Sequence, residues 1–210
     1  DLYYQLPNGS LDIFCMHIDK GYLWIGTTTN GVYRLNIDKK ELEHPIRKGN
    51  IISFYRDSGG ELWIGSWEEG LFHVKTNGKI ENFKYDAKNP HSLSSNFVRA
   101  CCEDNLGNIW IGTFNGLNRY NKSTGLFQNH TANDIQSDGL THSSIWCIVK
   151  DNQGTLWLGT YFGGVNYFNP EYEIYTRYSY SSNEKQGLSN PVVGRTIEDK
   201  NGNLWIGTEG

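Results

Sequence analysis

The heptapeptide GNIWIGT at residues 107–113 decides the fold, because close copies of it occur four more times along the chain. The copies are GYLWIGT (21–27), GELWIGS (60–66), GTLWLGT (154–160) and GNLWIGT (202–208). Their tryptophans, at positions 24, 63, 110, 157 and 205, are separated by 39, 47, 47 and 48 residues. A period of about 40–50 residues with strand-forming sequence is typical of propeller blades.

Each unit contains four predicted strands, A to D, in the same order. Strand A is an alternating run such as residues 98–102, and an Asp-x-x-Gly turn such as 104–107 follows it. Asp accepts backbone hydrogen bonds at the start of such a turn, and Gly adopts the positive φ at its end. Strand B is the core of the heptapeptide, and strands C and D come after it. In the first unit the turn is shorter, and Phe14, Met16 and Ile18 are expected to take the core positions of strand A.

Large apolar residues on both faces of strand B, with no helical periodicity, indicate sheets that are covered on both sides. The predicted fold class is therefore all-β, a β-propeller of tandem four-stranded antiparallel blades. The recurring Trp is expected to pack between neighbouring blades, with Trp24, Trp63, Trp110 and Trp157 largely buried. The Gly that ends each strand B is expected to allow a close backbone approach; these residues are Gly26, Gly65, Gly112, Gly159 and Gly207.

We predict four complete blades with partial blades at both ends. The complete blades cover residues 13–47, 51–85, 97–132 and 144–180. Residues 2–6 are expected to form strand D of a preceding blade, and residues 192–208 are expected to form strands A and B of a further blade. The chain is thus expected to be a fragment of a larger propeller, of about seven blades. Its open strand edges would pair with another copy or with the remaining propeller segment.

The composition excludes several classes of function. A net charge of −4 favours neither nucleic acid nor an anionic membrane surface as a partner.

The cysteines form no C-x-x-C pair, so we expect free, mostly buried thiols and no bound metal; they are Cys15, Cys101, Cys102 and Cys147. Cys101 and Cys102 are adjacent on one strand, so their side chains should point to opposite faces. No cofactor is predicted.

Residues 98–120, VRACCEDNLGNIWIGTFNGLNRY, resemble the two-component regulator propeller repeat, and the resemblance extends over essentially the whole chain. It implies the periplasmic sensor region of a hybrid two-component system protein, which combines a histidine kinase with a response regulator and is anchored in the inner membrane. It also implies that this segment is not itself an enzyme, since the kinase domain would lie downstream. The resemblance supplies no ligand-binding residue that can be placed on this sequence.

The loops between strands B and C should share one face of a propeller with the long D–A connections, and ligands commonly bind at such loops. The candidate ligand-binding residues on these loops are Trp67, Glu68, Glu69, Phe114, Asn115, Tyr161 and Phe162. Aromatic rings with polar neighbours suit the apolar faces and hydroxyl groups of a sugar, so the expected ligand is an oligosaccharide. On the innermost strand, Arg99 and Arg195 are candidates for the central channel.

Three interpretations of the recurring loop aromatics stay open: packing between blades, contact with a ligand, and a protein interface. Glu68 and Glu69 also suggest a carboxylate pair for glycoside hydrolysis, which requires two carboxyl groups about 5–9.5 Å apart across a cleft. Adjacent acids on a loop are more commonly just solvated. The alternatives to a sensor are accordingly a protein-interaction or dimerisation propeller, and a propeller lyase or glycosidase.

Overall fold

A computed structural model of the chain describes residues 6, 12–132, 139–170, 174–181 and 187–209. Within these ranges there are eighteen strands in five antiparallel sheets, and no helix. Four sheets contain four strands in chain order and the fifth contains two, so the propeller class predicted from the sequence is confirmed. Most of the strand predicted at residues 2–6 lies outside the described residues.

The four-stranded sheets are called blades 1 to 4. Blade 1 contains β1 (Ile13–Asp19), β2 (Tyr22–Thr27), β3 (Val32–Asn36) and β4 (Leu42–Ile46). Blade 2 contains β5 (Ile51–Arg56), β6 (Leu62–Ser66), β7 (Leu71–Val74) and β8 (Ile80–Phe83). Blade 3 contains β9 (Val98–Glu103), β10 (Ile109–Thr113), β11 (Gly116–Asn121) and β12 (Leu126–His130). Blade 4 contains β13 (Ile145–Lys150), β14 (Leu156–Thr160), β15 (Val165–Asn169) and β16 (Ile174–Tyr178). The two-stranded sheet contains β17 (Val193–Glu198) and β18 (Leu204–Thr208).

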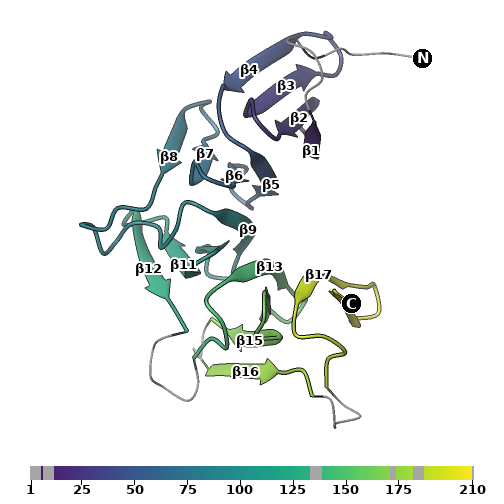
Figure 1. Ribbon diagram of the computed structural model, residues 1–210. Helices are drawn as coiled ribbons and strands as arrows, with labels where there is room; N and C mark the ends of the chain where they lie inside the picture. Colours follow the sequence, from purple (N-terminus) through teal and green to yellow (C-terminus); the bar gives the residue numbers. More distant parts are fainter. Residues whose placement is uncertain (1–5, 7–11, 133–138, 171–173, 182–186, 210) are drawn as a thin grey trace.

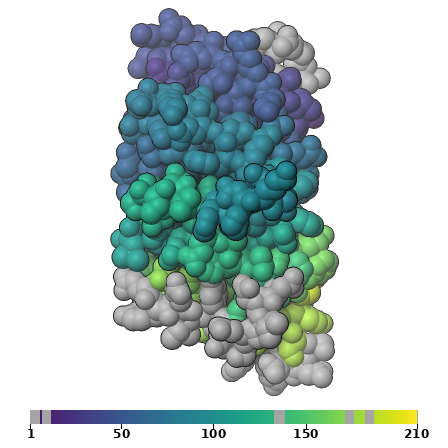
Figure 2. All heavy atoms as spheres, turned by 90° about the vertical axis from the view of Figure 1, so that its left-hand side faces the viewer, coloured from purple at the N-terminus to yellow at the C-terminus, as the bar shows by residue number. Residues whose placement is uncertain are grey.

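The sheets follow one another along an arc, with the first strand of each sheet on its concave side (Figure 1). Neighbouring inner strands contact one another, from β1 through β5, β9 and β13 to β17. Figure 2 looks onto the outer strands and shows the chain passing through the molecule as successive bands of colour. The stacking of sheet on sheet therefore brings the inner strands together around one central space.

The recurring Trp of blades 1, 2 and 3 packs against the blade that follows it. Trp63 of blade 2 lies in a buried cluster with Val98 and Ile111 of blade 3. Trp110 of blade 3 lies in a cluster with residues of blade 4, and its ring centroid is 5.0 Å from that of Phe168. Trp24, Trp63 and Trp110 are 4%, 0% and 1% exposed, as predicted.

Trp157 is less buried than these three, since part of its side chain stays exposed. The sheet that follows it has two strands, so nothing in the described structure takes the place that Phe168 takes against Trp110. Trp205 lies on that two-stranded sheet and is 64% exposed. Burial of the Trp thus depends on the next blade rather than on its own.

The expected phase of the first strand is also wrong by one residue. The structure pairs Cys15 with Gly26, just as it pairs Ser53 with Gly65 in blade 2. It also pairs His17 with Trp24. A one-residue change of register moves a strand's side chains to the opposite face. The residues expected in the core are therefore exposed; they are Phe14, Met16 and Ile18. That another copy or further blades cover the exposed residues at the ends of the chain stays a prediction.

In four of the five units, the Asp of the turn accepts a hydrogen bond from the Trp of the same unit. The indole Nε1 of Trp110 donates a hydrogen bond to Asp104 Oδ2 at 2.8 Å, and the pairs Trp63–Asp57, Trp157–Asp151 and Trp205–Asp199 repeat this contact. In the first unit the turn is shorter, and the buried Nε1 of Trp24 has no hydrogen-bond partner among the described residues. The turn therefore orients the ring that the next blade covers.

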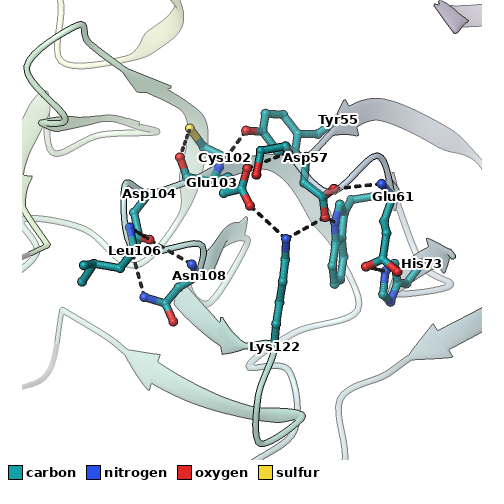
Figure 3. Close-up of polar contacts among 12 residues, drawn as sticks. Tyr55, Asp57, Glu61, His73, Cys102, Glu103, Asp104, Leu106, Asn108 and Lys122 are labelled. Atoms are coloured by element: carbon teal, nitrogen blue, oxygen red, sulfur yellow. Dashed lines mark hydrogen bonds and ion pairs between the residues drawn. The ribbon is translucent and has the colours of Figure 1, made fainter. Parts of the chain in front are cut away.

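A charged cluster joins blades 2 and 3 at the end of the sheets where the A–B and C–D turns lie (Figure 3). Lys122 Nζ lies 2.9 Å from Asp57 Oδ2 and 2.9 Å from Glu103 Oε1. Both carboxylates are almost fully buried, and Glu103 Oε2 also accepts a hydrogen bond from the backbone N–H of Ser58 at 2.7 Å. One ammonium group thus compensates two carboxylates from different blades.

The adjacent cysteines lie on opposite faces, as predicted. Cys101 belongs to the cluster between blades 2 and 3, and Cys102 belongs to the cluster between blades 3 and 4. All four cysteines are free thiols in the structure, and burial raises the pKa of Cys15 to about 12 and that of Cys102 to about 11. These thiols are therefore protonated at neutral pH and act as small packing groups.

The Gly at the end of strand B lies against the first residue of the next inner strand. A Cβ atom on Gly112 would come within 2.7 Å of Ile145 Cγ2, and one on Gly159 within 2.7 Å of Val193 Cγ1. At Gly207 the nearest atom would be Arg195 O at 3.5 Å, an ordinary contact. The expected close approach is confirmed at Gly112 and Gly159, and it is an approach between blades.

We expect Gly112→Ala to lower the free energy of unfolding by about 1–3 kcal/mol, because the added methyl group overpacks the contact between blades 3 and 4. Gly207→Ala is the matched control and should change this free energy by less than about 0.5 kcal/mol. Urea denaturation followed by tryptophan fluorescence measures both. Equal effects of the two substitutions would show that the contact between blades does not restrict this position.

Candidate functional site

The first strand of every sheet contains a β-bulge near its start. In blade 3, Val98 pairs with Thr113 and Ala100 with Gly112, so Arg99 is the extra residue; Trp146 is the extra residue in blade 4. The bulge residues of the five sheets are Phe14, Ile52, Arg99, Trp146 and Gly194. A bulge redirects the side chain that it carries, and all five of these residues line one central cavity.

The central cavity has a volume of about 630 Å³, within the range of small-molecule sites. Its wall comes from the five inner strands together with Asn50 and Trp67. Besides the bulge residues, it is lined by Cys15, Met16, Ser53, Phe54, Ala100, Cys147, Ile148, Val149, Arg195 and Thr196. The cavity is thus mostly apolar, with two arginines as its charged groups.

The loops between strands B and C are fixed beside the start of the inner strands. The backbone N–H of Trp67 donates to the carbonyl of Asn50 at 2.8 Å, and that of Phe114 donates to the carbonyl of Phe97 at 3.0 Å. Tyr161 makes the same bond in blade 4. The aromatic residue that follows Ser or Thr in each loop is therefore held at the same end of the blade as the bulge.

Three rings from three blades surround the guanidinium of Arg99. Its Cζ atom lies 4.0 Å from the ring centroid of Trp146, 5.3 Å from that of Trp67 and 5.4 Å from that of Phe114. These distances are within the range of cation–π interactions. Arg99 Nη1 also donates a hydrogen bond to Ser144 Oγ at 2.8 Å, while its buried Nε has no hydrogen-bond partner among the described residues. Burial lowers the pKa of Arg99.

The ring system continues on both sides of this arginine. Phe97 lies between Trp67 and Phe114, with centroid distances of 5.5 and 5.9 Å. Tyr161 stacks on Trp146 at 5.6 Å, and Phe162 meets Tyr161 edge-on at 4.3 Å. An aromatic surface therefore extends over the B–C loops of blades 2, 3 and 4 and reaches the cavity.

The structure brings together Trp67, Phe114, Tyr161 and Arg99, which the sequence had placed in two separate candidate sites. Trp67 and Phe114 remain 36% and 53% exposed, so packing between blades leaves part of each ring open to a ligand. Arg195 lines the same cavity as Arg99, although it takes the place of Ala100 in its strand rather than the bulge.

The other loop candidates lie away from the cavity wall. Glu69 forms ion pairs with Lys48 and Lys84, and hydrogen bonds from these two groups lower its pKa. Glu68 and Asn115 are exposed, and neither lines the cavity. The structure therefore does not place Glu68 and Glu69 opposite each other across a cleft.

Sequence reasoning missed Trp146 and Phe97. A signal for Trp146 exists, because it lies 47 residues after Arg99 and so occupies the same place in the repeat. The alternating pattern of strand A did not reveal Trp146, because a bulge inserts one extra residue and so interrupts the two-residue alternation. In the described part of the chain, no three His, Cys, Asp or Glu side chains are grouped to hold a metal ion, and no helix could span a membrane.

Comparisons with known proteins agree with this architecture. The family model of the two component regulator propeller matches residues 45–68, 92–115, 139–162 and 187–210. A search of curated proteins found no match. Among solved structures, the extracellular domain of a protein described as the hybrid two component system BT3049, from B. thetaiotaomicron, is 29% identical with a TM-score of 0.75. The match covers 98% of this chain and 27% of that one.

A second extracellular domain of the same organism, from the system BT4673, is 25% identical with a TM-score of 0.75 and the same coverage. A virginiamycin B lyase from Staphylococcus aureus is 17% identical, with a TM-score of 0.69 over 97% of this chain and 65% of the lyase, and shares the fold alone. This chain spans about a quarter of the two-component structures that it matches. The four matched stretches contain the A and B strands β5–β6, β9–β10, β13–β14 and β17–β18, so the chain carries four copies of the two component regulator propeller repeat.

Proposed function

We propose that this chain is part of the periplasmic sensor region of a hybrid two-component protein and that it binds an oligosaccharide in the central cavity. The observation that carries the proposal is the set of rings from Trp67, Phe114 and Trp146 gathered beside a cavity of about 630 Å³. Flat rings beside a mostly apolar cavity suit the apolar faces of sugar rings. The similarity to extracellular domains of hybrid two component systems supports the sensor role.

Signalling would require that the ligand bind two arrangements of the propeller with different affinity. The rings around Arg99 come from blades 2, 3 and 4, and the cavity wall includes strands of all five sheets. A sugar that contacts several of these groups would favour one spacing of the blades. A histidine kinase downstream would read that change.

The cavity supports binding better than hydrolysis. Glycosidases use two carboxyl groups that face each other across the substrate. The described residues that line this cavity include no Asp and no Glu. The similarity to a lyase concerns the fold only and transfers no activity.

We expect Trp146→Ala and Phe114→Ala each to weaken oligosaccharide binding about tenfold or more, because aromatic side chains commonly dominate such contacts. A glycan-library screen on the chain, followed by calorimetry on the glycans that bind, measures this. Leu106→Ala is the control, since Leu106 is 63% exposed and lies on an A–B turn at the opposite end of the blade.

Urea denaturation of the same variants separates binding from folding. If Trp146→Ala and Phe114→Ala lower the urea midpoint as well as the affinity, the loss of binding follows from lost stability, and the rings serve to pack the blades. If no glycan of the library binds, the proposed function is wrong.

A further inference from the structure

The charged lining of the central cavity has one sign. Among the described residues that line it, the charged side chains are Arg99 and Arg195 and none is a carboxylate, although the whole chain carries a net charge of −4. Two arginines elsewhere have acidic partners, since Arg34 pairs with Glu43 and Arg56 with Asp19. A focused positive potential inside a low-dielectric cavity attracts anions.

Arg99 is held in place but its hydrogen-bonding capacity is mostly unused. A guanidinium has five N–H donors, and the one direct hydrogen bond that the described structure gives this group runs from Nη1 to Ser144 Oγ at 2.8 Å. Its Nε is buried and has no hydrogen-bond partner in the part of the chain that the structure describes. Leaving a charged donor desolvated and unpaired is unfavourable, so the group is prepared for an acceptor.

The three rings explain how the unpaired charge is tolerated. Trp146, Trp67 and Phe114 present their faces to the guanidinium at 4.0–5.4 Å, and the quadrupoles of these rings attract a cation. The fork of N–H groups on a guanidinium matches the two oxygens of a carboxylate or sulfate.

We infer that the oligosaccharide bound in the central cavity is acidic, and that Arg99, assisted by Arg195, binds its carboxylate or sulfate groups. This inference rests on the proposed function, because it names the class of sugar that the same cavity takes. The sugar rings would stack on the aromatic surface while the anionic groups pair with the arginines.

The test uses a panel in which every acidic oligosaccharide is paired with a neutral form of the same glycan. Tetragalacturonate is compared with its methyl ester, and a carrageenan tetrasaccharide, which carries sulfate and no carboxylate, is compared with its desulfated form. Calorimetry should find affinity for at least one acidic member and a loss of about 10- to 100-fold when its charge is removed, the range for charge-assisted hydrogen bonds. The member that binds identifies carboxylate or sulfate as the group recognised.

The variants separate charge recognition from structure. Arg99→Gln should abolish the preference for the acidic member while keeping weak binding to both forms, and Arg99→Lys should retain part of the preference. Arg34→Gln, away from the cavity, should leave the preference unchanged. Urea denaturation of each variant checks that the fold is intact.

Two outcomes contradict the inference in different ways. If the chain binds neutral and acidic forms equally, or if Arg99→Gln keeps the full preference, the acidic class is wrong and the proposed function stands; Arg99 then serves only to organise the rings. If no oligosaccharide binds at all, the proposed function fails and the inference fails with it.

Discussion

Trp110→Ala should lower the free energy of unfolding by about 3–5 kcal/mol, the usual range for removal of a buried aromatic side chain. Trp110 is 1% exposed and fills the contact between blades 3 and 4, where it meets Phe168. The substitution would also leave Asp104 without the indole donor at 2.8 Å. Urea or guanidinium denaturation followed by circular dichroism measures the change.

Trp205→Ala is the matched control for this prediction. It occupies the same place in its repeat and makes the same hydrogen bond, to Asp199 at 3.0 Å, but it is 64% exposed. We expect a loss of less than about 1 kcal/mol there, since an exposed hydrogen bond contributes little. Equal losses at the two positions would mean that the repeat itself, rather than the next blade, determines the contribution of the Trp.

Lys122→Met should lower the free energy of unfolding by about 2–3 kcal/mol at neutral pH. Removal of one partner from a buried ion pair leaves the other charge uncompensated, and here two carboxylates, Asp57 and Glu103, would be left. The expected loss lies below the range for fully buried pairs, because Lys122 is 30% exposed. Methionine keeps the length and the apolar part of the side chain.

The loss should depend on pH in a defined direction. Burial alone would raise the pKa of Asp57 and Glu103, but hydrogen bonds from Trp63, Ser58 and Lys122 outweigh it and lower both values. A lowered pKa in the folded state contributes stability above the unfolded value, near pH 4, and this contribution disappears as the pH falls through the folded value. The difference between wild type and Lys122→Met should therefore be largest near pH 7 and should shrink as the pH falls below about 4.

Denaturation curves at pH 7, 5 and 3 test this dependence. The control is Lys79→Met, because Lys79 is 64% exposed and pairs with Glu81 at the surface, where ion pairs contribute at most about 1 kcal/mol. A difference that stays constant from pH 7 to pH 3 would show that Lys122 acts through packing and not through its charge.

The sequence by itself determined the blades. The heptapeptide, the Asp-x-x-Gly turn and the positions of the strands are local features, because each strand pairs with its neighbour across a short turn. The burial of Trp110 and the close approach at Gly112 followed from the same repeat. The first blade was misjudged because a turn shortened by one residue moves every side chain of β1 to the other face, which leaves Met16 exposed.

Only the tertiary structure decided how neighbouring blades bury and contact one another's side chains. Trp110, Trp157 and Trp205 occupy the same place in their repeats, yet they are buried, half-buried and exposed according to the sheet that follows them. The site depends on the same stacking, because Trp67, Arg99 and Trp146 come from three blades and meet where β-bulges redirect two of these side chains toward the central cavity. Such contacts span 32 to 47 residues of sequence and arise from packing between sheets, which a repeat pattern within one blade does not encode.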